Sequence, residues 1–266
     1  MIVSATLMPH APILLEEIGG KKSKKVQKTI LAMENIAEII SDSDPETIVI
    51  ISPHSLTWED KFIIPINKTG SGSFFDFGHS EIKYEQKLDQ KLGIEIVTKL
   101  AKKDFPVYSF YNEKTSYDLD HGILVPLHFI LKNTTSVKIL PMSYSFLPYT
   151  MHIKYGQKLF KILDKSKKRI AIIASGDLSH RLLDPDGFGK KFDDLLIKNL
   201  KNNDLKKIYD IDPKLIENTG ECGYRSLLIL LGAISGLDTK TKVLSYEGPL
   251  GVGYGVANFE ILNPKF

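Results

Sequence analysis

The chain has 266 residues, of which 42% are hydrophobic and 25% charged, proportions typical of a folded globular protein rather than a disordered or fibrous one. Its 35 basic and 32 acidic residues give a formal net charge of only +3, which argues against a nucleic-acid-binding protein. The single cysteine, Cys222, excludes an intrachain disulfide and fits a reducing, cytoplasmic setting. Since no run of 18 apolar residues and no signal-peptide pattern occurs, we expect neither a membrane span nor secretion.

Apolar runs of strand length alternate with helical patterns along the whole chain. We predict strands at 2–7, 47–52, 62–66, 137–141, 170–175, 242–246 and 255–261, and helices at 22–41, 82–103, 123–132, 149–166, 188–201 and 223–235. The runs 47–52 and 170–175 are almost wholly apolar, which is typical of central strands in a parallel sheet. The alternation predicts an α/β fold, a single domain over 1–266 with a mostly parallel or mixed central sheet and helices on both faces.

The stretch GSGSFFDFG at 70–78 combines glycines with three phenylalanines. Its composition predicts a flexible loop between the elements on either side. Two roles stay open for it, an ordinary surface loop or a lid that closes over a site.

Four histidines stand at the ends of predicted elements. His10, His54 and His180 each follow a predicted strand, and His121 directly precedes an apolar helix. In open α/β sheets, ligands bind outside the carboxyl ends of the strands, so we expect these side chains to share one site there. Imidazoles brought together serve as metal ligands or as proton carriers near neutral pH. The sequence therefore predicts a metal pocket at the C-terminal edge of the sheet.

An acidic residue is needed if the metal is to be held by two imidazoles and one carboxylate, the arrangement of non-haem iron(II) oxygenases. Glu221 in TGECGYRS, just before an apolar helix, is the best candidate. Its alternative role is that of an acid that favours the helix macrodipole. The neighbouring Cys222 is either a buried small side chain or a thiol at a helix start with a lowered pKa. Asp177 in SGDLSH is a weaker candidate. Three roles are open to it: a cap for the turn, a partner for the N–H of a histidine, or a direct metal ligand.

Two other chemistries are disfavoured by their motifs. The glycine-rich stretch 247–255 follows a predicted strand, but it leads into another strand and lacks a Lys-Ser/Thr ending. It is therefore neither a P-loop nor a dinucleotide fingerprint. Serines lie near the histidines, but none stands in a G-x-S-x-G turn, which argues against a serine hydrolase.

Six motifs together resemble a known family. They are MPHAPILLEEIGG, TIVIISPHS, LDHGILVPL, IASGDLSHRL, GECGYRSLLILLGA and VLSYEGPLGVGYGVA, spread from residue 8 to residue 257. The chain resembles the class III extradiol ring-cleavage dioxygenases, the superfamily of the LigB-type catalytic subunit. Within it, the chain is most similar to the AmmeMemoRadiSam branch, which includes the Memo proteins. The resemblance implies one LigB-type catalytic domain over 1–266.

The resemblance also implies a role for each histidine. His10 and His54, with Glu221, would hold an iron(II) ion. His180 would be the acid–base residue, and His121 would lie near the substrate. In the Memo proteins proper a cysteine belongs to the metal site, whereas this chain keeps the glutamate beside a cysteine and in this resembles the dioxygenases more closely.

The activity implied is that of a non-haem iron(II)-dependent extradiol-type dioxygenase, an oxidoreductase that inserts O2 into a catechol-like aromatic substrate. Two alternatives stay open, a metal-binding accessory protein of the AmmeMemoRadiSam system without turnover and a metal-dependent hydrolase. We expect Arg225, Tyr224 and Tyr246 to contact the substrate, although Arg225 has the alternative of pairing with a buried acid. The expected partners are a small-molecule substrate and O2, with no nucleic acid or membrane. A second copy of the chain or a partner of the AmmeMemoRadiSam system remains an option.

Overall fold

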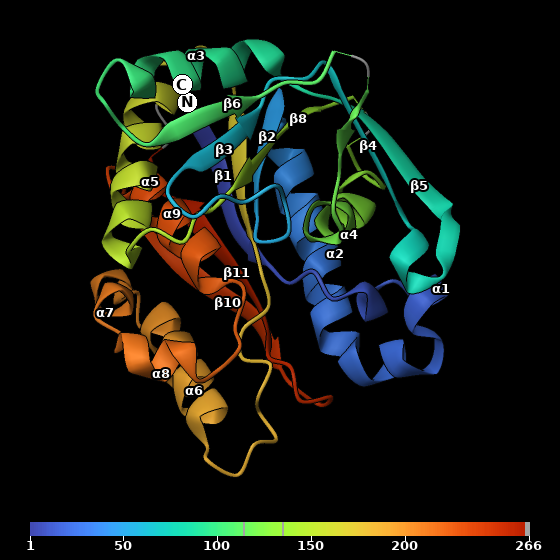
Figure 1. Cartoon of the computed structure of the whole chain (residues 1–266). Helices are drawn as coiled ribbons and strands as arrows, with labels where there is room; N and C mark the ends of the chain where they lie inside the picture. The colour runs from blue at the N-terminus through green and yellow to red at the C-terminus, as the bar shows by residue number, and fades with distance from the viewer. Residues whose placement is uncertain (114, 135, 264–266) are drawn as a thin grey trace.

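The centre of the molecule is a six-stranded mixed sheet (Figure 1). The computed structural model describes residues 1–113, 115–134 and 136–263. The sheet has the order β10-β11-β1-β9-β2-β8, in which β1, β9, β2 and β8 run parallel and β11 runs antiparallel to both of its neighbours, β1 and β10. Its strands are β1 (Ile2–Met8), β2 (Thr47–Ser52), β8 (Lys138–Ser143), β9 (Ile170–Ser175), β10 (Thr239–Glu247) and β11 (Tyr254–Ile261). The α/β fold with a mixed central sheet is confirmed.

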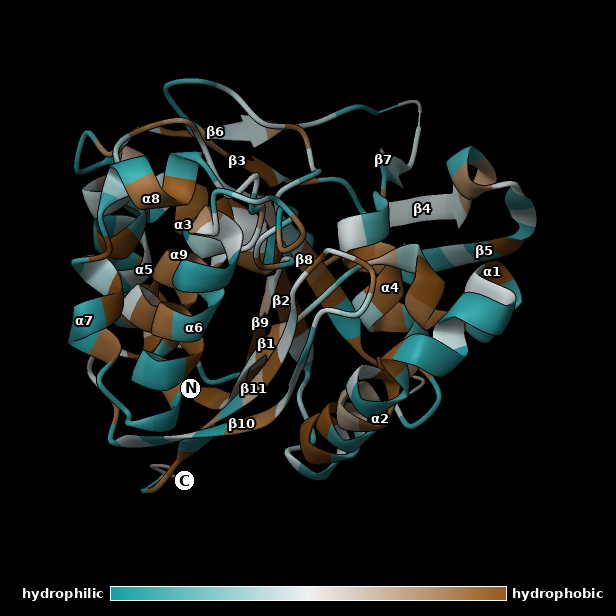
Figure 2. Ribbon diagram, turned by 90° about the horizontal axis from the view of Figure 1, so that it is seen from below, coloured by the Kyte–Doolittle hydropathy of each residue, from teal (hydrophilic) through white to brown (hydrophobic). Residues whose placement is uncertain are grey.

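Helices cover both faces of this sheet. One face packs against α3 (Gln90–Ala101), α5 (Tyr149–Leu163), α6 (Phe188–Lys201) and α9 (Tyr224–Ile234), and the other against α2 (Gln27–Asp42) and α4 (His121–Ile130). Successive side chains of β2 alternate between the two cores, since Val49 and Ile51 lie in the first and Ile48 and Ile50 in the second. Figure 2 shows the strands of the sheet between the two groups of helices. A strand buried on both faces explains why β2 and β9 are apolar throughout.

The helices α5 and α9 approach each other unusually closely. A Cβ atom built on Gly156 of α5 would lie 2.1 Å from the carbonyl oxygen of Ile229, and one on Gly232 of α9 would lie 2.4 Å from that of Ile153. Glycine at both positions therefore lets the two backbones meet. This contact fixes α9, whose N-terminal end carries the segment around Glu221.

Two smaller sheets and several short helices complete the fold. β3 (Phe62–Pro65) pairs in parallel with β6 (Val107–Phe110). β4 (Thr69–Phe74) lies between β5 (His79–Lys87) and β7 (Tyr117–Asp118). The short helices are α1 (Glu16–Gly19), α7 (Leu205–Tyr209) and α8 (Pro213–Glu217), with 3₁₀ turns at Pro12–Leu14, Gly20–Val26 and Phe75–Phe77. No helix in the described ranges has the length and apolar character that a membrane crossing would need.

The prediction for residues 70–103 was wrong in its first part. The stretch 70–78 is mostly the strand β4 and a 3₁₀ turn rather than a loop, and the helix predicted from residue 82 begins only at Gln90. Residues 79–87 form the strand β5, in which Ile82, Tyr84 and Gln86 are half-buried and alternate with exposed neighbours. The exposed positions are rich in Glu and Lys, whose intrinsic propensity favours a helix. The half-buried side chains, however, recur at every second residue, which is the period of a strand.

Candidate metal centre

Three of the predicted histidines meet in one cluster at the C-terminal edge of the sheet. His10 follows β1, His54 follows β2, and His121 is the first residue of α4. Their ring centroids lie 4.8 Å apart for His10 and His54, 5.3 Å for His10 and His121, and 4.1 Å for His54 and His121. Because β1 and β2 run in the same direction, the turns that follow them open on the same edge.

The thiol of Cys222 lies in the same place. Its Sγ is 3.4 Å from Nε2 of His10 and 3.8 Å from Nε2 of His180, so the fourth histidine borders the cluster through this sulfur. Two groups of side chains offer ligand atoms that all lie within 4.8 Å of one another: His10, His54 and His121, and His10, Asp177 and Cys222. His10 belongs to both groups and is therefore the centre of the site.

Two donor atoms lie at ligand-like separations from His10. Nε2 of His10 lies 3.1 Å from Nε2 of His54 and 3.4 Å from Sγ of Cys222. Two nitrogen ligands bound at about 2.0–2.1 Å to one ion lie roughly 3 Å apart, and a thiolate bound at about 2.3 Å lies roughly 3.1–3.5 Å from such a nitrogen. His54 and Cys222 therefore each have a ligand-like separation from Nε2 of His10, but they belong to different groups of candidate ligands.

The carboxylate of Glu221 is directed to its own helix. Its Oε2 accepts a hydrogen bond from the backbone N–H of Tyr224 at 2.5 Å, in the first turn of α9. Burial raises the pKa of this carboxyl to about 7. Neither group of candidate ligands among the described residues includes Glu221. The contact is the helix-start role that the sequence left open, and metal ligation by Glu221 stays a prediction.

A serine on β9 determines which nitrogen of His10 faces the cluster. The hydroxyl of Ser175 donates to the carbonyl oxygen of Gly122 at 2.5 Å, so its oxygen accepts from Nδ1–H of His10 at 3.0 Å. With the proton on Nδ1, Nε2 of His10 presents a lone pair to the cluster. An imidazole held in one tautomer through its other nitrogen is typical of metal sites.

Replacing Ser175 by alanine is expected to weaken metal binding by about 10- to 100-fold, because the Nδ1–H of His10 loses its acceptor. Competition with a chromophoric chelator measures the affinity. Ser235→Ala is the matched control, since the Ser235 hydroxyl also donates to a backbone carbonyl, that of Gly232 at 2.8 Å, but away from the cluster. Equal affinities for both variants would contradict the role given to Ser175.

The imidazoles of the cluster are neutral at neutral pH. Burial, followed by the neighbouring histidines, lowers the pKa of His10 well below its usual value. Burial also lowers the pKa of His54, and it lowers that of His121 to about 4 and that of His180 in the same direction. Neutral imidazole is the form that binds metal or accepts a proton, so the site is ready for either.

Asp177 ties together the turns that carry His10 and His180. Its Oδ1 accepts from the backbone N–H of His10 at 3.0 Å, and its Oδ2 lies 3.9 Å from Nε2 of His180. Burial raises the pKa of this carboxyl to about 7. The backbone beside it is equally tight, because a Cβ on Gly176 would lie 2.0 Å from Cα of Gly223. The turn after β9 and the turn that carries Cys222 are therefore in backbone contact.

The turn that carries His180 is held from behind by a buried carboxylate on α6. Oδ1 of Asp193 accepts from the backbone N–H of Ser179 at 2.9 Å, and Oδ2 accepts from the hydroxyl of Tyr246 at 2.9 Å. A Cβ on Gly253 would lie 1.9 Å from the same Oδ2. The glycine-rich stretch 247–255 thus passes close to Asp193, and Tyr246, expected at the substrate, uses its hydroxyl on this carboxylate.

The other two residues expected at the substrate differ from each other. Tyr224 is 1% exposed, and its hydroxyl donates to the carbonyl oxygen of Ile208 at 2.6 Å. The guanidinium carbon of Arg225 lies 4.5 Å from the ring centre of Tyr149 and 5.8 Å from that of Tyr144. Over the ranges that the structure describes, no carboxylate forms an ion pair with Arg225. Arg225 therefore stacks on aromatic rings, and contact of any of the three residues with a substrate stays a prediction.

A cavity of about 420 Å³ adjoins the cluster on the side of His54. Tyr117 and Phe110 contribute aromatic walls, and Asp120 accepts hydrogen bonds from nearby serine hydroxyls. On another side, the ring of Phe77 packs edge-on against His121 at 5.1 Å between centroids, so the turn between β4 and β5 reaches the site. The volume of the cavity beside His54 is within the range of small-molecule pockets.

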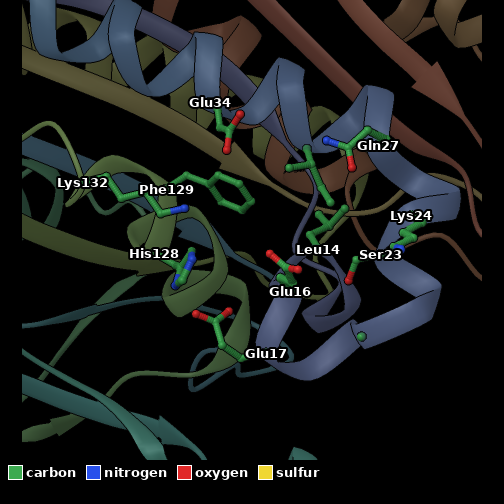
Figure 3. Close-up of a pocket in the computed structure, with 12 residues that line it drawn as sticks. Leu14, Glu16, Glu17, Ser23, Lys24, Gln27, Glu34, His128, Phe129 and Lys132 are labelled. Carbon is green, nitrogen blue, oxygen red and sulfur yellow. The ribbon is translucent and has the colours of Figure 1, made fainter.

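A second pocket, of about 300 Å³, lies between α2 and α4 and does not include the cluster (Figure 3). Glu34 and Gln27 of α2 face Phe129 of α4 and Lys132, just after the end of α4, across it. His128 lines this pocket, and its Nδ1 lies 2.8 Å from the hydroxyl of Tyr84.

Sequence reasoning gave too little weight to three contributors to the site. Ser175 is the last residue of a predicted strand, and its sequence context relates it only to serine-hydrolase motifs. Phe77 lies in the stretch predicted as a loop. Cys222 stands next to Glu221, the preferred ligand, and the only sequence signal for it is the resemblance to the Memo proteins, whose metal site includes a cysteine.

Comparison with known proteins places the chain in a family. The model of the catalytic LigB subunit of aromatic ring-opening dioxygenase matches residues 4–257. The protein CA_C1420 of Clostridium acetobutylicum is 37% identical over 264 residues, which cover 96% of this chain and 56% of that protein. The MEMO1 family protein MJ0403 of Methanocaldococcus jannaschii is 30% identical over 139 residues, 50% of this chain and 47% of that protein. The chain thus spans about half the length of these relatives.

A solved structure shares the fold. The uncharacterized protein JW3007 from Escherichia coli K12 superposes with a TM-score of 0.67 at 18% identity, over 97% of this chain and 99% of that one. Since the family model matches nearly the whole chain, the resemblance seen in the motifs is confirmed: the chain belongs to the family of the catalytic LigB subunit of aromatic ring-opening dioxygenase, and it is related to the MEMO1 family proteins.

Proposed function

We propose that the protein is a metal-dependent dioxygenase of the extradiol type, which binds a catechol-like diol and O2 at an iron(II) ion. The observation that carries the proposal is the meeting of His10 and His54, with Nε2 atoms 3.1 Å apart, beside the His180 side chain, which is 41% exposed. Two imidazoles hold the ion, and a further histidine stands free to handle protons. Membership in the LigB family supports this assignment.

Cys222 is the third ligand in this proposal, because its sulfur lies 3.4 Å from Nε2 of His10 and the Glu221 carboxylate is used at the start of α9. This ligand set joins His54 and Cys222, which belong to different groups of candidate ligands, through the His10 that both groups share. A metal ion held by these residues would lower the pKa of a coordinated hydroxyl and would bring diol and dioxygen together. A thiolate in place of a carboxylate makes the site softer, which also suits zinc or copper. The assay must therefore distinguish iron(II) from zinc and copper as the metal that supports activity.

The protein's own residues handle the proton and the substrate. Nε2 of His180 accepts the hydroxyl proton of the diol, since its imidazole is neutral at pH 7 and borders Cys222. The rings of His121 and Phe77 form an apolar contact on another side of the cluster. The cavity beside His54 provides space for the rest of the substrate.

The test is oxygen uptake by protein loaded anaerobically with iron(II), with a panel of catechols and spectroscopic detection of ring-opened product. We expect His180→Gln to keep its iron and to lose about 10²–10⁴-fold in turnover, the usual contribution of a general acid–base group. His128→Gln is the control, since His128 lines the separate pocket between α2 and α4 and pairs with Tyr84. Full iron occupancy without oxygen uptake for any diol would reject the dioxygenase.

That negative result would favour a second candidate, a metal-binding accessory protein without turnover. The observation in its favour is the thiol of Cys222 at the position expected for a carboxylate. Metal-loaded protein that forms a stable complex with a partner of the AmmeMemoRadiSam system would support it.

A further inference from the structure

A hollow of about 440 Å³ lies between α3 and α5, and its lining is dominated by cationic side chains. Three come from the end of α3 and the residues just after it, and three from the second half of α5 and just beyond. We call it the lysine hollow, after Lys99, Lys102, Lys103, Lys158, Lys161 and Lys165. The site described above uses none of these residues.

The lysine hollow lies at the edge of the sheet opposite the metal centre. The helix α5 begins at Tyr149, shortly after the C-terminal end of β8, and ends at Leu163, shortly before β9 begins. Its second half therefore reaches the N-terminal edge of the parallel strands. Figure 1 shows α3 and α5 beside each other, with the two chain ends marked nearby. A ligand bound there is separate from any substrate at the histidine cluster.

The positive charges of the lysine hollow are largely uncompensated. Within the described ranges, Lys99 alone among the six forms an ion pair, with Glu95 at 2.6 Å. Lys158 instead places its ammonium 5.2 Å from the ring centre of Phe105. No acidic side chain belongs to the lining, although the whole chain carries nearly as many acids as bases. Like charges held together repel one another, so an anion bound among them relieves that repulsion.

The shape of the lysine hollow favours a small ligand over a polymer. The lysines surround one hollow whose volume falls in the usual range of small-molecule sites. Leu100 and Ile162, both nearly fully buried, form an apolar floor in the same lining. Lysine ammonium groups are compact point charges on flexible stems and bind phosphate oxygens from several directions.

We propose that the lysine hollow binds a small molecule that carries a di- or triphosphate group. The phosphates lie among the ammonium groups, and Leu100 with Ile162 contacts any apolar part of the ligand. This proposal does not depend on the activity proposed for the metal centre.

Calorimetric titration with inorganic tripolyphosphate and with ATP, both without divalent metal and at physiological salt, tests the proposal. The triple variant Lys99→Gln, Lys158→Gln, Lys161→Gln is expected to bind tripolyphosphate at least about tenfold more weakly than the unchanged protein. The matched control replaces Lys21, Lys22 and Lys25 by glutamine, an equal loss of charge at exposed positions elsewhere. It is expected to change the affinity by less than about twofold.

Each outcome decides the question. Tripolyphosphate and ATP binding with equal affinity, or ATP binding more tightly through Leu100 and Ile162, both support the proposal if only the lysine-hollow variant loses affinity. An equal loss in both triple variants would show unspecific charge attraction and overturn it. If neither tripolyphosphate nor ATP binds, the proposal is also overturned. Sedimentation with phosphatidylglycerol vesicles is measured in parallel, and binding to the vesicles alone would indicate a membrane surface instead and overturn it as well. Circular dichroism melting curves establish that both variants are folded.

Discussion

Replacing Cys222 by serine is expected to lower the affinity for a divalent metal by more than about 100-fold, a larger loss than removal of an outer hydrogen-bond partner causes. The sulfur lies 3.4 Å from Nε2 of His10, whereas the Glu221 carboxylate accepts from the backbone of Tyr224. Glu221→Gln should therefore keep most of the metal affinity. Titration with cobalt(II) measures both variants, because a cobalt–thiolate bond gives a charge-transfer band that disappears with the sulfur.

The pair of variants decides between two ligand sets. If the site is the two-histidine, one-carboxylate arrangement, the results invert, with Glu221→Gln losing the metal and Cys222→Ser keeping it. The two positions are adjacent, so each variant controls for disturbance of the turn before α9. Unchanged affinity in both would place the third ligand elsewhere, with His121 the next candidate because its ring nitrogen belongs to the other group.

Replacing His10 by asparagine is expected to abolish metal binding and, with it, more than about 10³-fold of any metal-dependent activity. His10 is the one residue shared by both groups of candidate ligands. An asparagine amide reaches roughly where Nδ1 lies, so it can still donate to Ser175, but it has no atom in the place of Nε2. The variant therefore removes the ligand and keeps much of the packing of a residue that is 2% exposed.

Metal content after loading and gel filtration, determined by elemental analysis, measures this effect. His128→Gln is the control, since His128 belongs to a different pocket and pairs with Tyr84. Thermal unfolding of the metal-free proteins separates loss of the ligand from loss of the fold. A folded His10→Asn variant with full metal content would remove His10 from the site and refute the arrangement.

The central strands could be predicted from the sequence because burial on both faces leaves one simple pattern. The strands 47–52 and 170–175 have the predicted bounds in the structure, and every residue in them is buried. The hairpin of β4 and β5 could not be predicted in the same way. Its strand β5 is half-exposed and rich in glutamate and lysine, so residue preference and burial period pointed to different elements.

Part of the candidate site could likewise be predicted from the sequence, and part could not. The meeting of His10, His54 and His121 follows from their places in the sequence, the first two after predicted strands and the third at the start of an apolar helix. The directions of the Glu221 and Cys222 side chains cannot be predicted from the sequence. The two residues are adjacent in one turn, and only the backbone path of that turn decides which side chain faces His10. That path depends on the contact between Gly176 and Gly223, two positions far apart in the sequence.

The same glycine contact has a mechanical consequence. Since the backbones at Gly176 and Gly223 touch, and the backbone N–H of Gly223 donates to the carbonyl oxygen of Asp177 at 2.9 Å, the thiol-bearing turn cannot shift without carrying the neighbouring turn with it. In the proposed site, a displacement of the sulfur by a bound ion would therefore also move the turn that carries His180. Metal ligation and proton transfer by His180 would then be coupled through the main chain.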